Sequence, residues 1–536
     1  MKLNIKISWP IWLLTVSYWG LTLPFMSRLP YNWDAAQFVL ALRHYDISMH
    51  QPHPPGYPLF VVLGKLLSLV FTENTALVVV AALLGFVSVL VLYLFCYRLW
   101  SNKLGSSLIA IGYLLNPLFW LYRETALSYT ADAAASIIMG YVVWQTMTNR
   151  FRHYVLISSV VLAVAGAIRP SLVLLLLPLF IFQLSFHRRN WKLILMALGI
   201  VVVGTLAWLM PVMWLTGGVG EYLTHSRNLY STAAASINIG AQTKLLFNTL
   251  LVSLNIILIP MVAGVVLLVI RYRLYWRTFI HVYLYAVVWL LPAVLVYSFG
   301  HFGQLGYALI LVPPCYLLLI PVMQSSLDKW ILRWLGALGL ALISLIFLVL
   351  TPGYAHPNFF PHTRAELYLQ HLARITPNLF KLNRVAIKQN DTKLTSIMAA
   401  MTAYPPSQTV IVTGRDLLYP SPANGLLIRN DELLRELSAM LPDYTVVEVA
   451  PGRDYFLQAY ANQMETTYQR TITLPNELHY VVFMLDYFPS DQLPDQLMTT
   501  ALPLSGTDAF YQLGIMDQPW EFAGFTFQRE ADKLVP

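Results

Sequence analysis

Residues 76–97 read ALVVVAALLGFVSVLVLYLFCY, a run of 22 residues without one charged side chain. A helix that spans the hydrocarbon core of a membrane needs about 20 such residues, so this stretch predicts a membrane span. Similar apolar runs recur on both sides of it. They lie near 8–27, 104–121, 130–147, 154–168, 171–186, 193–215, 246–270, 278–299, 305–323 and 331–351. The sequence therefore predicts an α-helical polytopic membrane protein with about eleven transmembrane helices, although the short pair around Arg169 also fits a re-entrant hairpin.

The composition excludes several classes of protein. Of the 536 residues, 57% are hydrophobic and only 11% are charged, whereas soluble globular chains carry about 25% charged residues. An ordinary cytosolic enzyme and an intrinsically disordered chain are both excluded. The chain has two cysteines, Cys96 and Cys315, and both lie in apolar runs. A disulfide framework and a cysteine-based zinc site are therefore not expected.

The charges divide the chain into two domains. Residues 1–352 hold seven acids against 21 lysines and arginines, a net charge of +14, while residues 353–536 hold 19 acids against 13, a net charge of −6. In the second part, β-rich runs at 409–413, 445–449 and 480–485 alternate with helical runs at 364–375, 392–401 and 431–440. This alternation predicts a C-terminal α/β soluble domain with a partly parallel sheet. No cluster of basic residues resembles a nucleic-acid-binding patch, so no nucleic-acid partner is expected.

The lysines and arginines also predict the orientation in the membrane. With a cytoplasmic N-terminus, 14 of them fall in inner loops and seven in outer loops, as the positive-inside rule requires. The odd number of spans then places the C-terminal domain outside. The first apolar run is too long for a cleaved signal peptide and lacks a small-residue cleavage site, so it is interpreted as a span. In the long first outer loop, about 28–75, residues 33–44 and 58–71 are interpreted as interfacial helices.

Three acids, Asp34, Glu124 and Asp132, lie where an outer loop meets an apolar segment. Ionisable groups at a membrane boundary are costly, so each is a functional candidate. Asp34 also fits a helix N-cap with Gln37 as its N3 partner, and Asp132 fits a cap of the helix that follows it. A carboxylate in this position could accept a proton from an acceptor hydroxyl or amine, and the neighbouring Trp33 ring could stack on a sugar.

Other polar residues fall on the same side of the membrane. His53 lies in the proline-rich bend 52–58, and its spacing from His50 leaves a metal site open as an alternative, although Pro52 prevents a regular helical pair. Arg169 interrupts an apolar run and must face a watery cavity, an acid or a phosphate, or else extend to the interface. Three more residues, His301, Gln304 and Tyr307, mark another outer edge.

Three segments together resemble the GT-C glycosyltransferases: YNWDAAQFVLALR at 31–43, HPPGYPLFVVLGKLL at 53–67 and RETALSYTADA at 123–133. The similarity is greatest to the protein O-mannosyltransferase-like branch and to the aminoarabinose-to-lipid-A transferases. In layout it covers about residues 8–352. The resemblance implies a GT-C fold and a transferase that takes a sugar from a polyprenyl-phosphate carrier on the extracytoplasmic side, in a bacterial inner membrane. It further implies that the C-terminal domain covers the site or engages the acceptor.

The resemblance also implies roles for individual residues. Asp34 matches the catalytic acid of the first loop, and Glu124 matches the acidic position of the second. His53 stands where the lipid A branch has a phosphate-contacting lysine, and Arg169 matches a basic position near the fifth span. The expected donor-phosphate contacts are Arg43, His53, Arg123 and Arg169, and the expected substrate contacts are Trp33, Tyr57, His301, Gln304 and Tyr307.

Two other functions stay open. A transporter or flippase for a lipid-linked or anionic substrate would bind it near the midplane between repeated halves, and the sequence shows no such repeat. A structural membrane protein with an outer domain is the third interpretation. The acceptor is a lipid, a glycan or a protein, and the sequence identifies neither it nor the sugar. No cofactor is assigned, and a divalent metal remains an alternative.

Overall fold

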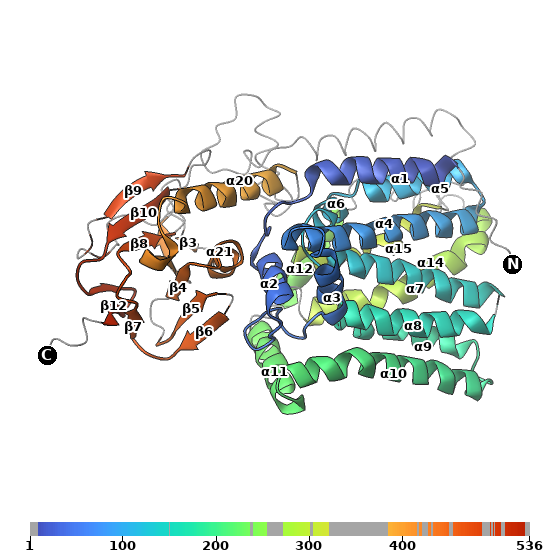
Figure 1. The fold of residues 1–536 in the computed structure, drawn as a ribbon. Helices are drawn as coiled ribbons and strands as arrows, with labels where there is room; N and C mark the ends of the chain where they lie inside the picture. Colours follow the sequence, from blue (N-terminus) through green and yellow to red (C-terminus); the bar gives the residue numbers. More distant parts are fainter. Residues whose placement is uncertain are drawn as a thin grey trace, which may run out of the picture. The chain divides into compact units, whose positions relative to one another are not determined.

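The computed structural model describes two regions of the chain, one helical and one containing the strands (Figure 1). The described residues are 9–149, 151–235, 239–253, 272–300, 304–320, 384–414, 418–420, 427–429, 433–449, 454–461, 463–484, 494, 497, 499–504 and 510–530. The expected span at 331–351, the expected helix at 364–375, His301 and the expected domain boundary at 352/353 lie outside them.

Internal contacts group the chain into two compact units. The helical unit contains Trp9–Met26, the described residues from Pro54 to Ile320 and residues 384–386. The mixed unit contains Ser27–His53 together with the described residues from Ile387 onward. Residues 27–53, which the charge pattern assigned to the transmembrane domain, therefore belong to the same unit as the C-terminal residues. We call this segment the Asp34 loop.

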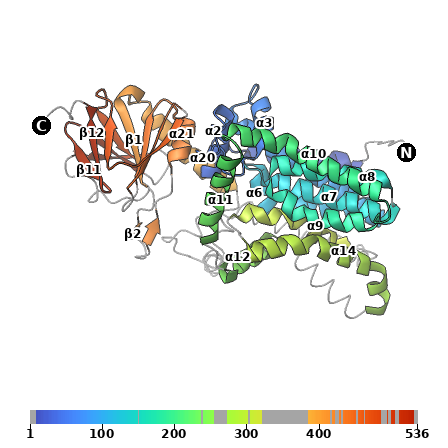
Figure 2. The same ribbon diagram turned by 90° about the horizontal axis from the view of Figure 1, so that it is seen from below.

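Apolar helices build the helical unit. Their bounds are α1 Trp9–Thr22, α3 Pro58–Leu67, α4 Glu73–Trp100, α5 Lys103–Leu114, α6 Pro117–Arg123, α7 Tyr129–Asn149, α8 Arg152–Ile168, α9 Ser171–Ser185, α10 Trp191–Leu215, α11 Val219–Ala235, α12 Ile239–Ser253, α14 Tyr272–Phe299 and α15 Val312–Leu317, with 3-10 turns η1 Leu23–Phe25 and η2 Leu305–Ile310. Helix α7 packs between α4 and α8, and α8 packs on α9 and α10. Figure 2 shows α12 beside α14. Most of the expected spans thus correspond to helices.

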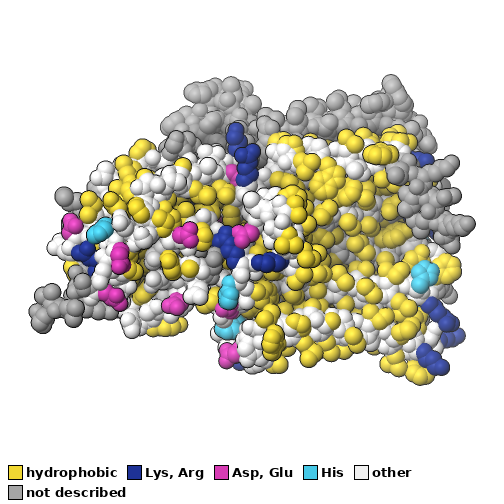
Figure 3. Space-filling view, viewed as in Figure 1, with side chains coloured by type: hydrophobic (Ala, Val, Ile, Leu, Met, Phe, Trp, Pro, Cys, Tyr) yellow, Lys and Arg dark blue, Asp and Glu magenta, His cyan; other side chains and the backbone are white. Residues whose placement is uncertain are grey.

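Within the described ranges, three helical segments are long and apolar enough to cross a membrane: Glu73–Trp100, Trp191–Leu215 and His281–Phe299. Helix α10 exposes large apolar side chains along its length, among them Val203 and Trp214. Figure 3 shows the same apolar character across this face of the helical unit. Apolar patches of this extent are rare on soluble monomers, so the unit is built to sit in lipid.

The expected span at 104–121 is bent. Helices α5 and α6 meet at an angle of 65° and count as one span only if the bent pair is taken together. The break follows from Asn116, whose side chain accepts a hydrogen bond from the backbone of Phe119 at 3.1 Å and caps a new helix. Pro117 occupies the first turn, where its missing N–H costs nothing. The run from 305 to 320 is similarly divided into η2 and α15.

Both expected interfacial segments are helices. The segment 33–44 forms α2, Trp33–Arg43, in the mixed unit, and the segment 58–71 begins with α3 in the helical unit. The proline-rich bend between them contains two cis X-Pro bonds, Gln51–Pro52 and Pro54–Pro55, and Tyr57 in the left-handed region with φ of 49°.

The C-terminal part of the mixed unit confirms the α/β prediction. Its described strands include a seven-stranded sheet in the order β6-β5-β4-β1-β8-β10-β9. The central strand β1, Thr409–Gly414, pairs in parallel with β4, Thr445–Val449, and with β8, Tyr480–Phe483. The remaining pairings in this sheet are antiparallel, with β5 Phe456–Tyr460, β6 Gln463–Thr467, β9 Thr499–Pro503 and β10 Phe510–Ile515. Strands β1 and β4 are buried along their whole length, as parallel strands covered on both faces should be.

Smaller elements complete the unit. A three-stranded sheet consists of β11 Trp520–Phe522, β12 Phe525–Arg529 and β7 Thr471–Leu474, and a hairpin consists of β2 Leu418–Pro420 and β3 Leu427–Arg429. Two helices, α20 Arg384–Met401 and α21 Leu434–Met440, belong to the same region, beside the 3-10 turn η4 Pro406–Gln408. Helix α2 packs on α21, so the Asp34 loop and the C-terminal residues share one packed body.

Candidate active site

Asp34 lies in the first turn of α2 and is 7% exposed. The expectation that it caps this helix is wrong: Asn32 is the N-cap, and its Oδ1 accepts a hydrogen bond from the backbone of Ala35 at 3.0 Å. Both Asn32 and Asp34 have short polar side chains of the kind that cap helices. The backbone is extended at Asn32, so the helix begins directly after it. The Asp34 carboxylate therefore has a role other than capping α2.

One neighbour of the Asp34 carboxylate is His53, from the far end of the Asp34 loop. Its Nδ1 lies 3.9 Å from Oδ1 of Asp34 and 2.8 Å from Oε1 of Gln37. A protonated Nδ1 donates to the amide oxygen and faces the carboxylate at the same time. Gln37 is fully buried, so this contact orients the imidazole ring. Residues 19 positions apart thus form one acid–imidazole cluster, which the sequence placed only on the same side of the membrane.

Two other expected site residues belong to the same loop. Trp33 precedes Asp34, and the guanidinium of Arg435 lies 5.4 Å from the centre of its ring. Arg43 ends α2 and is half-buried.

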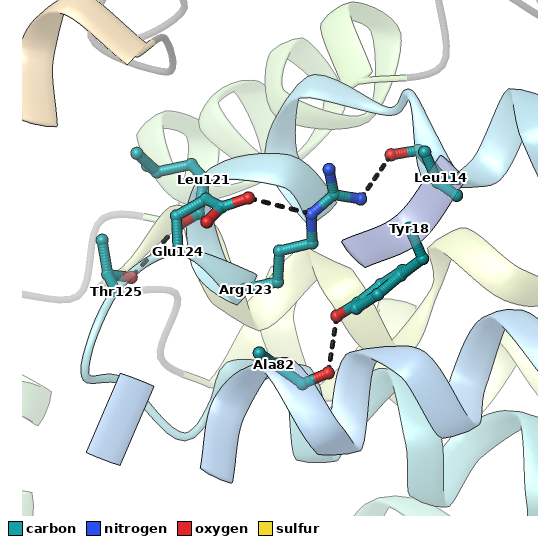
Figure 4. A network of polar contacts seen from close by, with 7 residues as sticks. All are labelled: Tyr18, Ala82, Leu114, Leu121, Arg123, Glu124 and Thr125. Carbon is teal, nitrogen blue, oxygen red and sulfur yellow. Dashed lines mark hydrogen bonds and ion pairs between the residues drawn. The ribbon is translucent and has the colours of Figure 1, made fainter. Parts of the chain in front are cut away.

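Glu124 and Arg123 form a second polar cluster, in the helical unit (Figure 4). Glu124 is the C-cap of α6, and its Oε1 lies 3.2 Å from Nε of Arg123. Nη1 of Arg123 donates to the carbonyl of Leu114 at 2.8 Å, and its guanidinium lies 5.0 Å from the Tyr18 ring centre. Neither Arg123 nor Glu124 has any exposed surface. A lipid phosphate could therefore reach Arg123 only after the residues that surround its guanidinium move apart.

The environment of Glu124 also alters its acidity. Burial raises the pKa of this carboxyl from 4.5 to about 8, although the adjacent Arg123 opposes the change. One oxygen, Oε2, and one nitrogen, Arg123 Nη2, have no hydrogen-bond partner. The carboxyl is thus held near the pH range in which it could exchange a proton.

Arg169 forms a third cluster, around the break between α8 and α9. Its Nη1 donates to Oδ2 of Asp132 in the first turn of α7, and both side chains are buried. The guanidinium lies over the rings of Tyr129 and Tyr307, 4.8 Å and 4.5 Å from their centres. Of the partners expected for Arg169, the acid is therefore the one that the structure shows. The expectation that Asp132 caps the following helix is wrong, because its carboxylate binds Arg169 instead.

Close packing supports this cluster. A Cβ on Gly306 would clash with the Tyr129 ring, and the backbone N–H of Gly306 donates to the Tyr122 hydroxyl at 2.9 Å. Tyr307 also stacks on Tyr297, with ring centres 5.5 Å apart. The sequence analysis missed Tyr129 and Tyr297. The pairing of Asp132 could have been predicted from Arg169, because a buried arginine requires a carboxylate as its partner.

The remaining expected substrate contacts lie near this cluster. Tyr57 is 6% exposed and lies within electrostatic range of Arg169. Gln304 precedes η2 and is half-buried. Residues of the helical unit thus include Tyr57, Arg169 and Tyr307 in one neighbourhood and Arg123 with Glu124 in another. Asp34 and Glu124 belong to different units, and their expected shared hollow stays a prediction.

In the described parts of the chain, no three His, Cys, Asp or Glu side chains group closely enough to hold a metal ion. The divalent metal that the sequence left open is therefore not assigned to any residues.

Part of the chain is similar to a known family. The sequence model of the protein O-mannosyl-transferase TMEM260 N-terminal domain matches residues 34–194. The protein O-mannosyl-transferase tmem260 of Dictyostelium discoideum is 27% identical over 127 residues, which cover 22% of this chain and 15% of that protein. The match thus spans less than a sixth of the relative's own length.

Two solved structures resemble the whole chain. Both are of ArnT from Cupriavidus metallidurans, one bound to undecaprenyl phosphate with a TM-score of 0.54 and one in the apo state with a TM-score of 0.58. Each is 12% identical, and the alignments cover 94% and 95% of this chain and 97% of each ArnT chain. A helical membrane region followed by a strand-containing domain is therefore the shared fold. The chain therefore shares the fold of ArnT, and its residues 34–194 are similar to the N-terminal domain of the protein O-mannosyl-transferase TMEM260.

Proposed function

We propose that this chain transfers a sugar from a polyprenyl-phosphate-linked donor to a lipid, glycan or protein acceptor, with Asp34 as the catalytic base. The observation that carries the proposal is the extent of the O-mannosyl-transferase match, residues 34–194, which begins at Asp34 and includes Glu124 and Arg169. The undecaprenyl phosphate bound by ArnT, a protein of the same fold, supports the class of donor.

In the proposed reaction, the acceptor hydroxyl or amine gives its proton to the Asp34 carboxylate and attacks the anomeric carbon of the donor. The new glycosidic bond forms as the bond from that carbon to the phosphate oxygen breaks. The polyprenyl phosphate leaves with the electron pair, in one inverting displacement. A phosphate stabilised by cations is a good leaving group, so no strong general acid is needed.

The cations divide by accessibility. His53, which faces Asp34, is part-buried and Arg43 is half-buried, so these two are proposed as the first contacts of the donor phosphate. Arg123 and Arg169 each hold a carboxylate inside the protein. Their proposed contact with phosphate requires them to exchange that partner, because arginine binds carboxylate and phosphate with the same planar donors. The sugar and acceptor are proposed to contact Trp33, Tyr57, His301, Gln304 and Tyr307.

The finer topology is also a proposal. Eleven spans with a cytoplasmic N-terminus place the Asp34 loop and the C-terminal domain on the extracytoplasmic side, in a bacterial inner membrane facing the periplasm. The two-to-one excess of lysine and arginine in the inner loops supports this orientation.

The proposal is tested with membranes that contain the full-length chain and with radiolabelled undecaprenyl-phosphate mannose. The wild type is expected to produce labelled acceptor, and Asp34→Asn is expected to abolish transfer while the protein stays folded and inserted. Asp46→Asn is the matched control, because Asp46 lies in the same loop and binds Ser48 instead. Full turnover in Asp34→Asn would remove the assigned base. Uptake of label into sealed vesicles without product would favour the transporter.

A further inference from the structure

The Asp34 loop is held from both ends by the C-terminal residues of the mixed unit. At its start, both carboxylate oxygens of Asp391 accept hydrogen bonds from consecutive backbone amides, those of Arg28 at 3.0 Å and Leu29 at 3.1 Å. The neighbouring Asn390 donates through Nδ2 to the carbonyl of Pro30 at 2.9 Å. Both residues lie on α20, more than 350 positions away along the chain. Three consecutive residues that lead into α2 are thus bound to one turn of another helix.

At the far end of the loop, Arg435 on α21 makes the corresponding contact. Its Nη1 donates to the carbonyl of Met49 at 2.8 Å, four residues before His53. The same guanidinium lies over the ring of Trp33, which adjoins Asp34. Arg435 is 5% exposed, so this contact is shielded from water and from competing ions. A hydrogen bond from a charged donor in such a place contributes more than an exposed one.

Between these two anchors, α2 packs on α21. Inside the loop, Asp46 and Gln51 form an isolated bridge, and Gln37 binds His53. The loop that carries Asp34 thus contacts the C-terminal residues at three places: before α2, after α2 and along α2 itself.

We infer that Asp391 and Arg435 are positioning residues that hold the loop bearing the proposed base Asp34, so that the C-terminal domain is a structural part of the catalytic site. This inference rests on the proposed function for the role of Asp34. The C-terminal domain then does more than cover the site or bind the acceptor: its removal would displace the base. A displacement of about 1 Å at a reacting group can cost on the order of a hundredfold in rate.

The test uses the full-length protein in lipid nanodiscs with two readouts. Hydrogen–deuterium exchange follows the backbone of residues 27–53, and transfer from radiolabelled undecaprenyl-phosphate mannose gives kcat and KM. The variants are Asp391→Ala and Arg435→Met. Matched controls are Glu477→Gln and Arg470→Met, exposed residues of the same unit. The conservative variants Asp391→Asn and Arg435→Lys each retain part of the contact and remain informative if the harsher changes prevent folding.

Loss of the Asp391 acceptor is expected to speed exchange at Arg28 and Leu29 by about tenfold, since one hydrogen bond is worth about that factor. Transfer is expected to fall by about 10- to 100-fold in kcat, with KM for the donor changed by less than about twofold, because the base and not the donor site moves. The controls should match the wild type in both readouts, and Arg435→Lys should recover most of the kcat lost in Arg435→Met.

Exchange in the Asp34 loop that stays at the wild-type rate in both variants would overturn the inference. Faster exchange with undiminished kcat would overturn it as well, because the loop would then need no support. The two proposals fail separately: full turnover in Asp34→Asn, or no product from the wild type, counts against the proposed function. The exchange measurement does not depend on turnover and still decides whether the C-terminal residues hold the loop.

Discussion

The helical unit buries two arginine–carboxylate pairs that differ in how the chain brings the partners together. Arg123 and Glu124 are neighbours in sequence, and the end of α6 places them in contact. Arg169 and Asp132 are 37 residues apart, and they meet only because α7 packs on α8 and α9. The Arg123–Glu124 pair can stay in contact when the helices shift. The Arg169–Asp132 pair requires the packing of α7 on α8 and α9. Removing a partner should therefore have different consequences at the two places.

The largest effect is expected at the distant pair. Asp132→Ala leaves the buried guanidinium of Arg169 without its carboxylate, which should lower the free energy of unfolding by about 3–5 kcal/mol. Unfolding in mixed micelles measures it, with Glu221→Ala as the control because that acid is 64% exposed. The double variant Asp132→Leu with Arg169→Met should recover most of the loss, since an apolar pair removes both charges. A single variant as stable as the wild type would show that packing does not depend on this pair.

At the adjacent pair, the pH dependence of stability is the sharper measurement. Burial raises the pKa of Glu124 from 4.5 to about 8. Between these two pH values, the folded protein therefore holds a proton that the unfolded chain has released. The free energy of unfolding should fall as pH rises through this window, by at most about 1.4 kcal/mol per pH unit. Glu124→Gln carries no ionisable group there and should remove that slope. Identical pH profiles for the two proteins would contradict the assigned burial.

A smaller effect is expected where the distant pair is packed. In Gly306→Ala the added methyl group meets the Tyr129 ring, which lies over Arg169. Overpacking of this kind costs about 1–3 kcal/mol. Gly20→Ala in α1 is the matched control, because no atom lies within 4 Å of its added Cβ. Equal melting temperatures for Gly306→Ala and the wild type would show that the ring can move freely.

The smallest effect is expected from the second ring over Arg169. Tyr307→Leu removes an aromatic face 4.5 Å from the guanidinium and should cost about 0.5–2 kcal/mol. Tyr307→Phe keeps the face and should lie close to the wild type in the same unfolding measurement. If Phe and Leu destabilise equally, the hydroxyl and not the ring supports Arg169.

Periodicity and composition predicted the elements better than the contacts between them. The runs at 409–413 and 445–449 became β1 and β4, and the short segments at 33–44 and 58–71 became helices. The bend at Asn116 was missed because the hydrophobicity of an apolar run does not show whether its helix is straight. The Asn116-Pro117 pair was the feature that could have predicted a new helix start. The capping role expected for Asp34 was wrong because Asn32 competes for it two residues earlier.

The amino-acid sequence by itself determined that the chain enters a membrane, that a mixed α/β domain follows, and that acids gather near loop ends. These are properties of local composition, because burying apolar side chains and exposing charges favours the same segments in any arrangement. Only the tertiary structure decided that Asp132 neutralises Arg169, that His53 faces Asp34, and that Asp391 and Arg435 hold the loop between them. Such pairs join residues tens or hundreds of positions apart, and their contact energy exists only once the intervening helices and strands have packed.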